Sequence, residues 1–296
     1  MKYFYHALFL VTTGNIFHLE SIKIKDSIKV VYTADISSSS LTIISLFSVL
    51  EFVDASKIQF YIVASGASLD EAKNTALLLS KALFCLSNSY IRIITYVHPP
   101  SSPLFFSKSA VSSSTPHWFS STETLRLLIP KLFDFDRYIY FDNDVIVTKS
   151  GILDSLWNRE IDPESVVAIC MEKLAKSEAK QIIKSYFNNS VSVMKEHFLL
   201  DNTDRISESK PVDNSDANSH DDAISIFNEY VPYFPNNGVM LVNATKWRNF
   251  NLTDRFMSLA AKVRQDQEAG KPHLAFGSQP FMLVLLRDQM MHLPPV

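Results

Sequence analysis

Residues 138–147 read Tyr-Ile-Tyr-Phe-Asp-Asn-Asp-Val-Ile-Val, an apolar run that stops at two acids spaced by one residue. A short apolar run bounded by polar residues is typical of a buried strand. Two carboxylates at the point where the chain leaves a strand can converge on one cation, and hard oxygen ligands favour Mg²⁺ or Mn²⁺. Ligands of open α/β sheets bind at the carboxyl ends of the strands. Asp142 and Asp144 therefore predict a metal and nucleotide site, the alternative being an acidic turn without function.

Apolar and amphipathic segments alternate on both sides of this stretch. We expect strands at 29–33, 59–63, 90–97, 138–141, 166–171 and 239–242. Helical spacing predicts helices at 41–50, 69–86, 253–267 and 279–286, and a helix that contains Arg126 and is capped by Ser121 or Thr122. The alternation indicates an α/β fold, a single Rossmann-like domain with a mostly parallel central sheet flanked by helices.

Composition excludes several classes of protein. A chain of 296 residues that is 47% hydrophobic can bury the core of one large domain. The polar segment 196–228 predicts a mobile insertion. A formal charge of -3 provides no basic surface for nucleic acid. Cys85 and Cys170 are the only cysteines, which excludes a disulfide framework and a cysteine-ligated zinc site.

The N-terminal segment 1–28 is typical of a leader in some respects. Lys2 precedes an apolar run at 3–11, but the run contains His6 and is shorter than the ~20 residues of a membrane span, so we expect no stable transmembrane helix. Acceptor sequons at Asn188, Asn243 and Asn251 fit a secretory route. The sequence therefore leaves two locations for the protein, the secretory pathway or Golgi and the cytoplasm.

Glycine usage restricts how a phosphate group could be bound. The six glycines form neither Gly-x-Gly-x-x-Gly nor a Walker-type loop, so backbone amides of such a loop cannot cradle a diphosphate. A cation held by Asp142 and Asp144 would neutralise the diphosphate instead. A nucleotidyltransferase shares the sheet and the acids but needs a phosphate-gripping loop near the N-terminus, and residues 32–35 provide none.

Five blocks, in this order, resemble glycosyltransferase family 8, the group of glycogenin and the bacterial lipopolysaccharide galactosyltransferases. The blocks lie at 31–35, at 123–133, at 142–144 with 153–157, at 233–243 with Trp247-Arg248, and at 277–280. The resemblance implies a domain of the GT-A type over 29–296. It also implies a retaining, metal-dependent transfer of a hexose from a UDP-sugar to a hydroxyl acceptor on a glycan, lipid or protein, with Mn²⁺ or Mg²⁺ as the cofactor.

The resemblance also implies roles for residues around the nucleotide. Asp142 is similar to the family residue that touches both metal and ribose, and Asp144 to the stronger metal ligand. Asp35 resembles the acid that pairs with the uracil edge, with Ala34 beside it.

Three more residues resemble groups around the donor sugar. Arg126 matches a basic residue that contacts the donor phosphate or sugar, Asn236 an asparagine that binds sugar hydroxyls, and Gln279 a catalytic glutamine beneath the anomeric carbon. Judged alone, Asp35 could equally cap a helix, Arg126 pair with Glu123, and Asn236 form a turn.

Two departures from the family pattern bear on activity. Ser278 stands where the family has an aspartate before the glutamine. The family completes its metal site with a histidine in a His-x-Gly-x-x-Lys-Pro-Trp segment beyond a Leu-Pro-Pro block, and this sequence ends at Leu293-Pro294-Pro295-Val296. We therefore expect a C-terminally incomplete domain whose activity is in doubt. The alternative function is a non-catalytic family member that binds a nucleotide-sugar or a partner.

Overall fold

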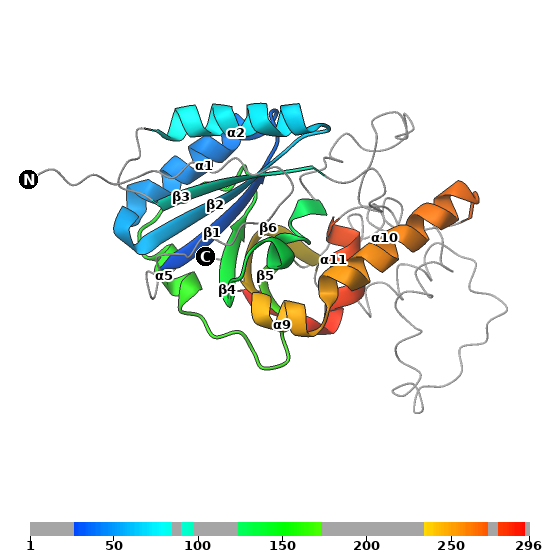
Figure 1. Cartoon of the computed structure of the whole chain (residues 1–296). Coiled ribbons are helices and arrows are strands. Elements are labelled where there is room, and N and C mark those ends of the chain that lie inside the picture. The colour runs from blue at the N-terminus through cyan, green and yellow to red at the C-terminus, as the bar shows by residue number, and fades with distance from the viewer. Residues whose placement is uncertain (1–26, 85–89, 98–123, 173–233, 272–277, 294–296) are drawn as a thin grey trace, which may run out of the picture.

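The computed structural model describes residues 27–84, 90–97, 124–172, 234–271 and 278–293. A mixed seven-stranded sheet forms its centre, in the order β3-β2-β1-β4-β6-β5-β7 (Figure 1). The strands are β1 (Ile28–Ala34), β2 (Ile58–Ser65), β3 (Tyr90–Tyr96), β4 (Arg137–Phe141), β5 (Val167–Glu172), β6 (Phe234–Asn243) and β7 (Met290–Leu293). The helices are α1 (Ser39–Phe52), η1 (Ala55–Lys57), α2 (Leu69–Leu83), α4 (Ile129–Leu132), α5 (Ile152–Trp157), α9 (Ala244–Asn249), α10 (Leu252–Glu268), α11 (Ser278–Leu286) and η5 (Arg287–Gln289).

The sheet is mostly parallel, as the sequence predicts. Strand β1 pairs in parallel with β2 and β4, β2 with β3, and β5 with β7. Within this sheet β6 alone runs against its neighbours, β4 and β5. The N-terminal end of β6 therefore lies at the same edge as the carboxyl ends of β1 and β4.

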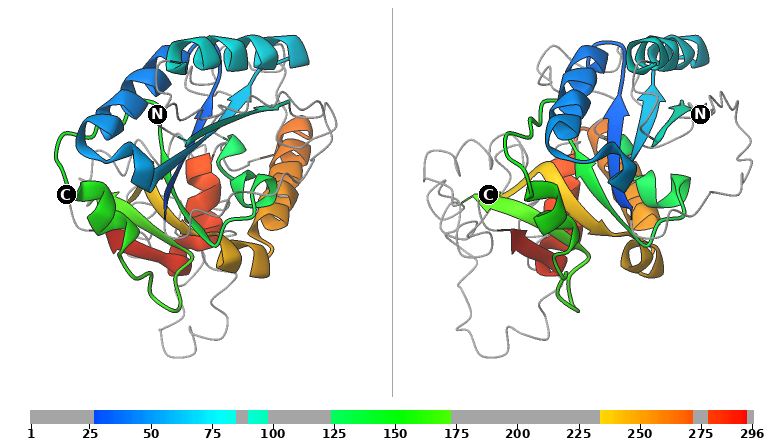
Figure 2. Two further views of the ribbon diagram at one scale, coloured as in Figure 1. Left: turned by 60° about the vertical axis from the view of Figure 1, so that its left-hand side comes forward. Right: turned by 90° about the vertical axis from the view of Figure 1, so that its left-hand side faces the viewer.

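Helices cover both faces of the sheet, which follows from the apolar side chains on both sides of its central strands. One core contains residues of α1, α2 and α5, and the other contains residues of α4, α9, α10 and α11. The two turned views show these helices on opposite sides of the strands (Figure 2). Buried Tyr140 and Phe141 are neighbours in β4 and point into different cores, because side chains alternate along a strand.

The structure corrects two expectations about local conformation. Thr124 and Leu125 are helical, but Arg126 already lies in the tight turn that follows, since the N–H groups of Leu127 and Leu128 donate to carbonyls three residues earlier. Strand β6 begins at Phe234, five residues before the expected start. Its pairing with β5 shifts register between Ile169 and Cys170, and this irregularity accommodates a proline in the strand.

Other expectations fall partly or wholly outside the described residues. These include the leader segment, the insertion at 196–228, Cys85, the sequon at Asn188, and the caps Ser121 and Thr122. Cys170 lies half-buried in β5, and Asn251 is exposed at the start of α10. None of the helices in the described ranges has the length and apolar content that crossing a bilayer requires.

Candidate active site

The acidic turn that follows β4 is fixed at both ends. The N–H of Asp142 donates to the Gly238 carbonyl at 2.8 Å, which ties the turn to β6. On the other side, Asn143 Oδ1 accepts a hydrogen bond of 2.9 Å from the Thr42 hydroxyl of α1. The Val147 N–H donates to Ser48 Oγ at 2.9 Å. The middle residue of the acid pair is thus an anchor to α1, and Asp144 beside it is exposed.

Arg126 forms a forked ion pair with Asp142. Its Nη2 lies 2.7 Å from Asp142 Oδ1, and its Nη1 lies 3.4 Å from Oδ2. Nη1 also donates to the Asn237 carbonyl of β6 at 3.2 Å. The Arg126 side chain is only 7% exposed. This guanidinium is therefore buried against the acidic turn, and its alternative partner Glu123 lies outside the described residues.

Tyr140 connects this ion pair to β1, and the sequence alone did not single it out. Its hydroxyl donates to Asp142 Oδ1 at 3.0 Å and lies 2.9 Å from Thr33 Oγ1. The Arg126 guanidinium lies 4.9 Å from the centre of the Tyr140 ring. Burial raises the pKa of the Tyr140 hydroxyl well above its ordinary value, so it is a donor at neutral pH. Its position two residues before Asp142, on one face of the strand, is a signal that sequence reasoning could have used.

Asp35, directly after β1, uses one oxygen to organise the start of α1. Its Oδ1 accepts from the Ser38 N–H at 2.9 Å and from the hydroxyls of Ser37 and Ser38 at 2.6 Å and 2.9 Å. These hydrogen bonds close the turn that leads into α1, whose N-cap residue is Ser38, a local role that is open to an isolated aspartate. Asp35 Oδ2 accepts no hydrogen bond from the described residues and is available to a ligand. Ala34 is fully buried as the last residue of β1, so its methyl group lines the core.

The N-terminal half of β6 lies against the acids. Asn236 is exposed, and its Oδ1 accepts from the Gly238 N–H at 3.0 Å, the local turn that its sequence allows. A side chain at Gly238 would bring a Cβ within 3.8 Å of Asp142 Oδ2. That is an ordinary van der Waals distance, whereas the same Cβ would stand only 3.2 Å from Asn236 Oδ1, so glycine leaves room for the Asn236 side chain. Asn237 is 2% exposed, and neither end of its amide has a partner among the described residues.

Gln279, at the start of α11, lies beside the same segment. Its Nε2 is 3.4 Å from the Pro235 carbonyl, directly before Asn236. Arg248 of α9 secures the chain after Arg126, because its guanidinium donates to the carbonyls of Phe135 at 2.6 Å and Pro130 at 3.3 Å. The conformation of the Arg126 turn is therefore supported by α9.

The expected site residues thus meet at one edge of the sheet, although sequence places them far apart. Asp142 and Asp144 provide the oxygen ligands that Mg²⁺ or Mn²⁺ prefers. The described residues hold no cluster of three or more acidic, histidine or cysteine side chains that could coordinate a metal. Two carboxylates fit a cation whose remaining ligands are phosphates and water, which is common for Mg²⁺.

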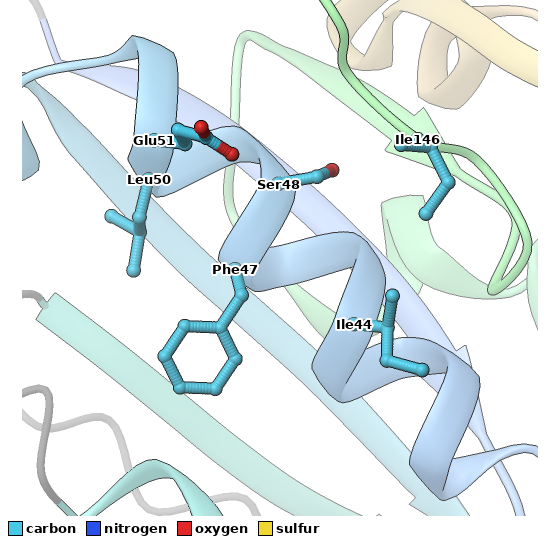
Figure 3. Close-up of a pocket in the computed structure, with 6 residues that line it drawn as sticks. All are labelled: Ile44, Phe47, Ser48, Leu50, Glu51 and Ile146. Atoms are coloured by element: carbon cyan, nitrogen blue, oxygen red, sulfur yellow. The ribbon is translucent and has the colours of Figure 1, made fainter.

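A separate hollow of about 570 Å³ lies on the outer side of α1 (Figure 3). Its lining is mostly apolar, with Glu51 as the charged residue: Ile44, Phe47, Ser48, Leu50, Glu51 and Ile146. An apolar wall with a carboxylate does not favour a diphosphate. The acidic turn with its buried arginine is the better candidate for a nucleotide site.

Comparison with known proteins identifies a family for most of the chain. Residues 29–296 match the family model described as "Glycosyl transferase family 8". No protein of curated function matches the sequence significantly.

Several solved structures share the fold. The bifunctional glycosyltransferase WbbM has a TM-score of 0.56 and 14% identity over 93% of this chain, which spans 40% of the WbbM chain. The galactosyltransferase LgtC, solved with donor and acceptor sugar analogues, has a TM-score of 0.54 and 18% identity over 90% of this chain and 73% of its own. The mannosyltransferase Ktr4p from S. cerevisiae has a TM-score of 0.50 and 9% identity over 96% of this chain and 73% of its own.

Proposed function

The chain belongs to glycosyltransferase family 8, and on this basis we propose that it transfers a hexose from a UDP-sugar to a hydroxyl acceptor with retention of configuration. The observation that carries the proposal is the acidic turn after β4, held between α1, Arg126 and the start of β6. Glycosyl transfer needs a stabilised leaving group, because the sugar becomes oxocarbenium-like while the nucleotide takes up negative charge.

Asp142 and Asp144 would hold a divalent cation, Mn²⁺ or Mg²⁺. When bound, this cation would neutralise charge on the diphosphate. Asp142 carries one negative charge that Arg126 already offsets, whereas Asp144 is exposed and has no ion pair within the described ranges. The pair therefore attracts a bare cation weakly, and a diphosphate bound at the same time would add both ligands and negative charge.

The other residues at this edge would bind the donor. Arg126 would contact a phosphate or the sugar, because its guanidinium is planar and has several donors. Asp35 would use its second oxygen to accept from the uracil edge, while its first oxygen keeps closing the turn before α1. Asn236 and Gln279 would contact the sugar from β6 and α11, with Gln279 stabilising positive charge at the anomeric carbon.

The proposal is tested by hydrolysis of the donor, since water can replace the acceptor slowly. UDP-glucose and UDP-galactose are incubated with the full chain and Mn²⁺, and UDP release is measured. We expect release with one of the two donors that stops when EDTA removes the metal. Metal-dependent UDP binding is measured in parallel by calorimetry. Release that persists in EDTA at the same rate contradicts a metal-dependent mechanism.

A second candidate is a family member that binds a nucleotide-sugar without transferring it. It is favoured by Ser278, which replaces an acid of the family pattern, and by the two-carboxylate metal site in the described part of the chain. Metal-dependent UDP binding without hydrolysis or transfer to any glycan, lipid or protein hydroxyl would support this function. Absence of UDP binding would exclude both candidates.

We further propose that 29–296 forms one glycosyltransferase domain. Its described parts share one continuous sheet, which supports this boundary. The leader at 1–28 and the mobile insertion at 196–228 stay predictions, as does the choice between the secretory pathway and the cytoplasm.

A further inference from the structure

The Tyr140 hydroxyl lies between Thr33 of β1 and Asp142 of the acidic turn. An ionised carboxylate only accepts hydrogen bonds, so Tyr140 must donate its proton to Asp142 Oδ1, at 3.0 Å. The remaining contact, 2.9 Å to Thr33 Oγ1, must then run from the threonine hydroxyl to the tyrosine oxygen. The direction of both hydrogen bonds is thereby set by the charge on Asp142.

Tyr140 also contacts the other member of the ion pair. Its ring lies under the Arg126 guanidinium, with 4.9 Å between the guanidinium carbon and the ring centre. Tyr140 is 1% exposed and Arg126 is 7% exposed, so water hardly competes with these contacts. One side chain thus restrains both the carboxylate and its counter-charge.

The two oxygens of Asp142 are consequently unequal. Oδ1 accepts from Arg126 Nη2 at 2.7 Å and from Tyr140 at 3.0 Å. Oδ2 has only a long contact of 3.4 Å with Arg126 Nη1 among the described residues. The Asp142 side chain is 29% exposed, so solvent or a ligand reaches the carboxylate. The protein occupies one oxygen and leaves the other accessible.

We propose that Tyr140 is a positioning residue that holds Asp142 so that Oδ2 faces the bound cation or the nucleotide ribose. This inference rests on the proposed function and adds to it the residue that orients the carboxylate. A hydrogen bond from a neighbouring group to a ligating carboxylate fixes the orientation of that ligand, and its loss commonly weakens metal binding.

Substitution Tyr140→Phe tests the role, because it removes the hydroxyl and keeps the ring below Arg126. Its matched control is Tyr138→Phe, two residues earlier in β4, where the tyrosine is equally buried at 1% and no hydrogen bond joins its hydroxyl to a described residue. UDP affinity is measured by calorimetry with Mn²⁺ and with EDTA. Thermal melting confirms that each variant is folded.

We expect Tyr140→Phe to weaken Mn²⁺-dependent UDP binding about tenfold, the lower end of the range for lost outer ligand contacts. Binding in EDTA should change less than twofold, and Tyr138→Phe should bind like the wild type under both conditions. Thr33→Val, which removes only the donor to Tyr140, should fall between wild type and Tyr140→Phe.

The outcomes separate this inference from the proposed function. Wild-type binding that depends on Mn²⁺, together with unchanged binding by Tyr140→Phe, overturns the positioning role alone. An equal loss in Tyr138→Phe, or an equal loss in EDTA, also overturns it, because the effect would then come from packing. A wild-type chain without metal-dependent UDP binding contradicts the proposed function and the positioning role together.

Discussion

Asp35 and Asp142 each follow the last residue of a parallel strand, but their carboxylates are held in different ways. The hydrogen bonds of Asp35 go to Ser37 and Ser38, two and three residues along the chain. Asp142 pairs with Arg126, sixteen residues away, and its backbone N–H reaches Gly238 in β6. One acid is organised by its own loop, and the other by three separate parts of the fold.

Because of this difference, we expect substitution of the two acids to have different effects on stability. Asp35 closes the turn before α1 with one oxygen, so a change there should disturb the site locally. Asp142 offsets the charge of a buried guanidinium, so its loss removes a charge partner from a cation that is shielded from water. We infer that substitution of Asp142, beside the proposed metal, lowers the free energy of unfolding considerably. Substitution of Asp35, beside the proposed base, should lower it much less.

The largest expected effect follows from Asp142→Asn. Removing one member of a fully buried ion pair costs roughly 3–5 kcal/mol, and since Asp142 is partly exposed we expect a loss of about 2–3 kcal/mol in the free energy of unfolding. Mn²⁺-dependent UDP binding should vanish as well. Urea denaturation of Asp142→Asn and Asp35→Asn compares the two acids directly. Equal stability losses would remove the distinction between them.

Asp144→Asn should affect binding without affecting stability. The side chain is exposed, and a neutral amide keeps its shape but loses most of the attraction for a divalent ion. We expect Mn²⁺-dependent UDP affinity to fall by ~100-fold or more, beyond the usual loss for an outer contact. Asp162→Asn, an exposed acid before β5, is the control. Retained metal-dependent binding in calorimetry would contradict the metal assignment.

Asp35→Ala should change the choice of base more than the strength of metal binding. Losing one hydrogen-bonding partner of the base corresponds to about a tenfold loss of UDP affinity. We expect the ratio of UDP to CDP affinity to drop by a similar factor. The stability cost should be that of lost hydrogen bonds in an exposed turn, about 1 kcal/mol. If the ratio is the same as in the wild type, Asp35 does not read the base.

Thr42→Val should give the smallest effect, because it removes one hydroxyl, which donates to Asn143 Oδ1 and to the Ser38 carbonyl before α1. The net value of one hydrogen bond is about 1 kcal/mol, and we expect UDP–Mn²⁺ affinity to weaken two- to threefold, or about 0.5 kcal/mol. Thr75→Val in α2 makes the same change at a buried threonine that is hydrogen-bonded to Ser65 and Glu71. Stability should fall similarly in both variants, and a loss of affinity in Thr75→Val would show that the Asn143 anchor is not specific to the site.

Much of the site could be predicted because its residues stand in local patterns. Asp142 and Asp144 follow an apolar run, and Asn236 stands two residues before a glycine, so each is recognisable within a few positions. Tyr140 and Thr33 were not singled out as site residues. A buried tyrosine in an apolar strand has the same pattern as a core residue, and its neighbour Tyr138 is one.

The conformation of Arg126 also depended on contacts that no local pattern carries. Its segment has helical spacing in the sequence, but the chain forms a tight turn there before α4. Carbonyls after this turn accept hydrogen bonds from Arg248, more than a hundred residues later, while Arg126 itself bonds to Asp142 and the Asn237 carbonyl. Tertiary contacts of this kind override local helix propensity.

The periodicity of apolar residues was enough to determine the α/β class, the mostly parallel sheet and the strand that ends in the acids, because burial of alternating or periodic side chains is a local property of the chain. Only the tertiary structure decided that β6 runs antiparallel beside β4 and brings Gly238 to Asp142. It also decided which oxygen of Asp142 accepts the short hydrogen bonds, because Arg126 and Tyr140, both buried, contact the same oxygen, Oδ1. Hydrogen bonds and ion pairs between distant segments have directions and distances that exist only once the strands are paired.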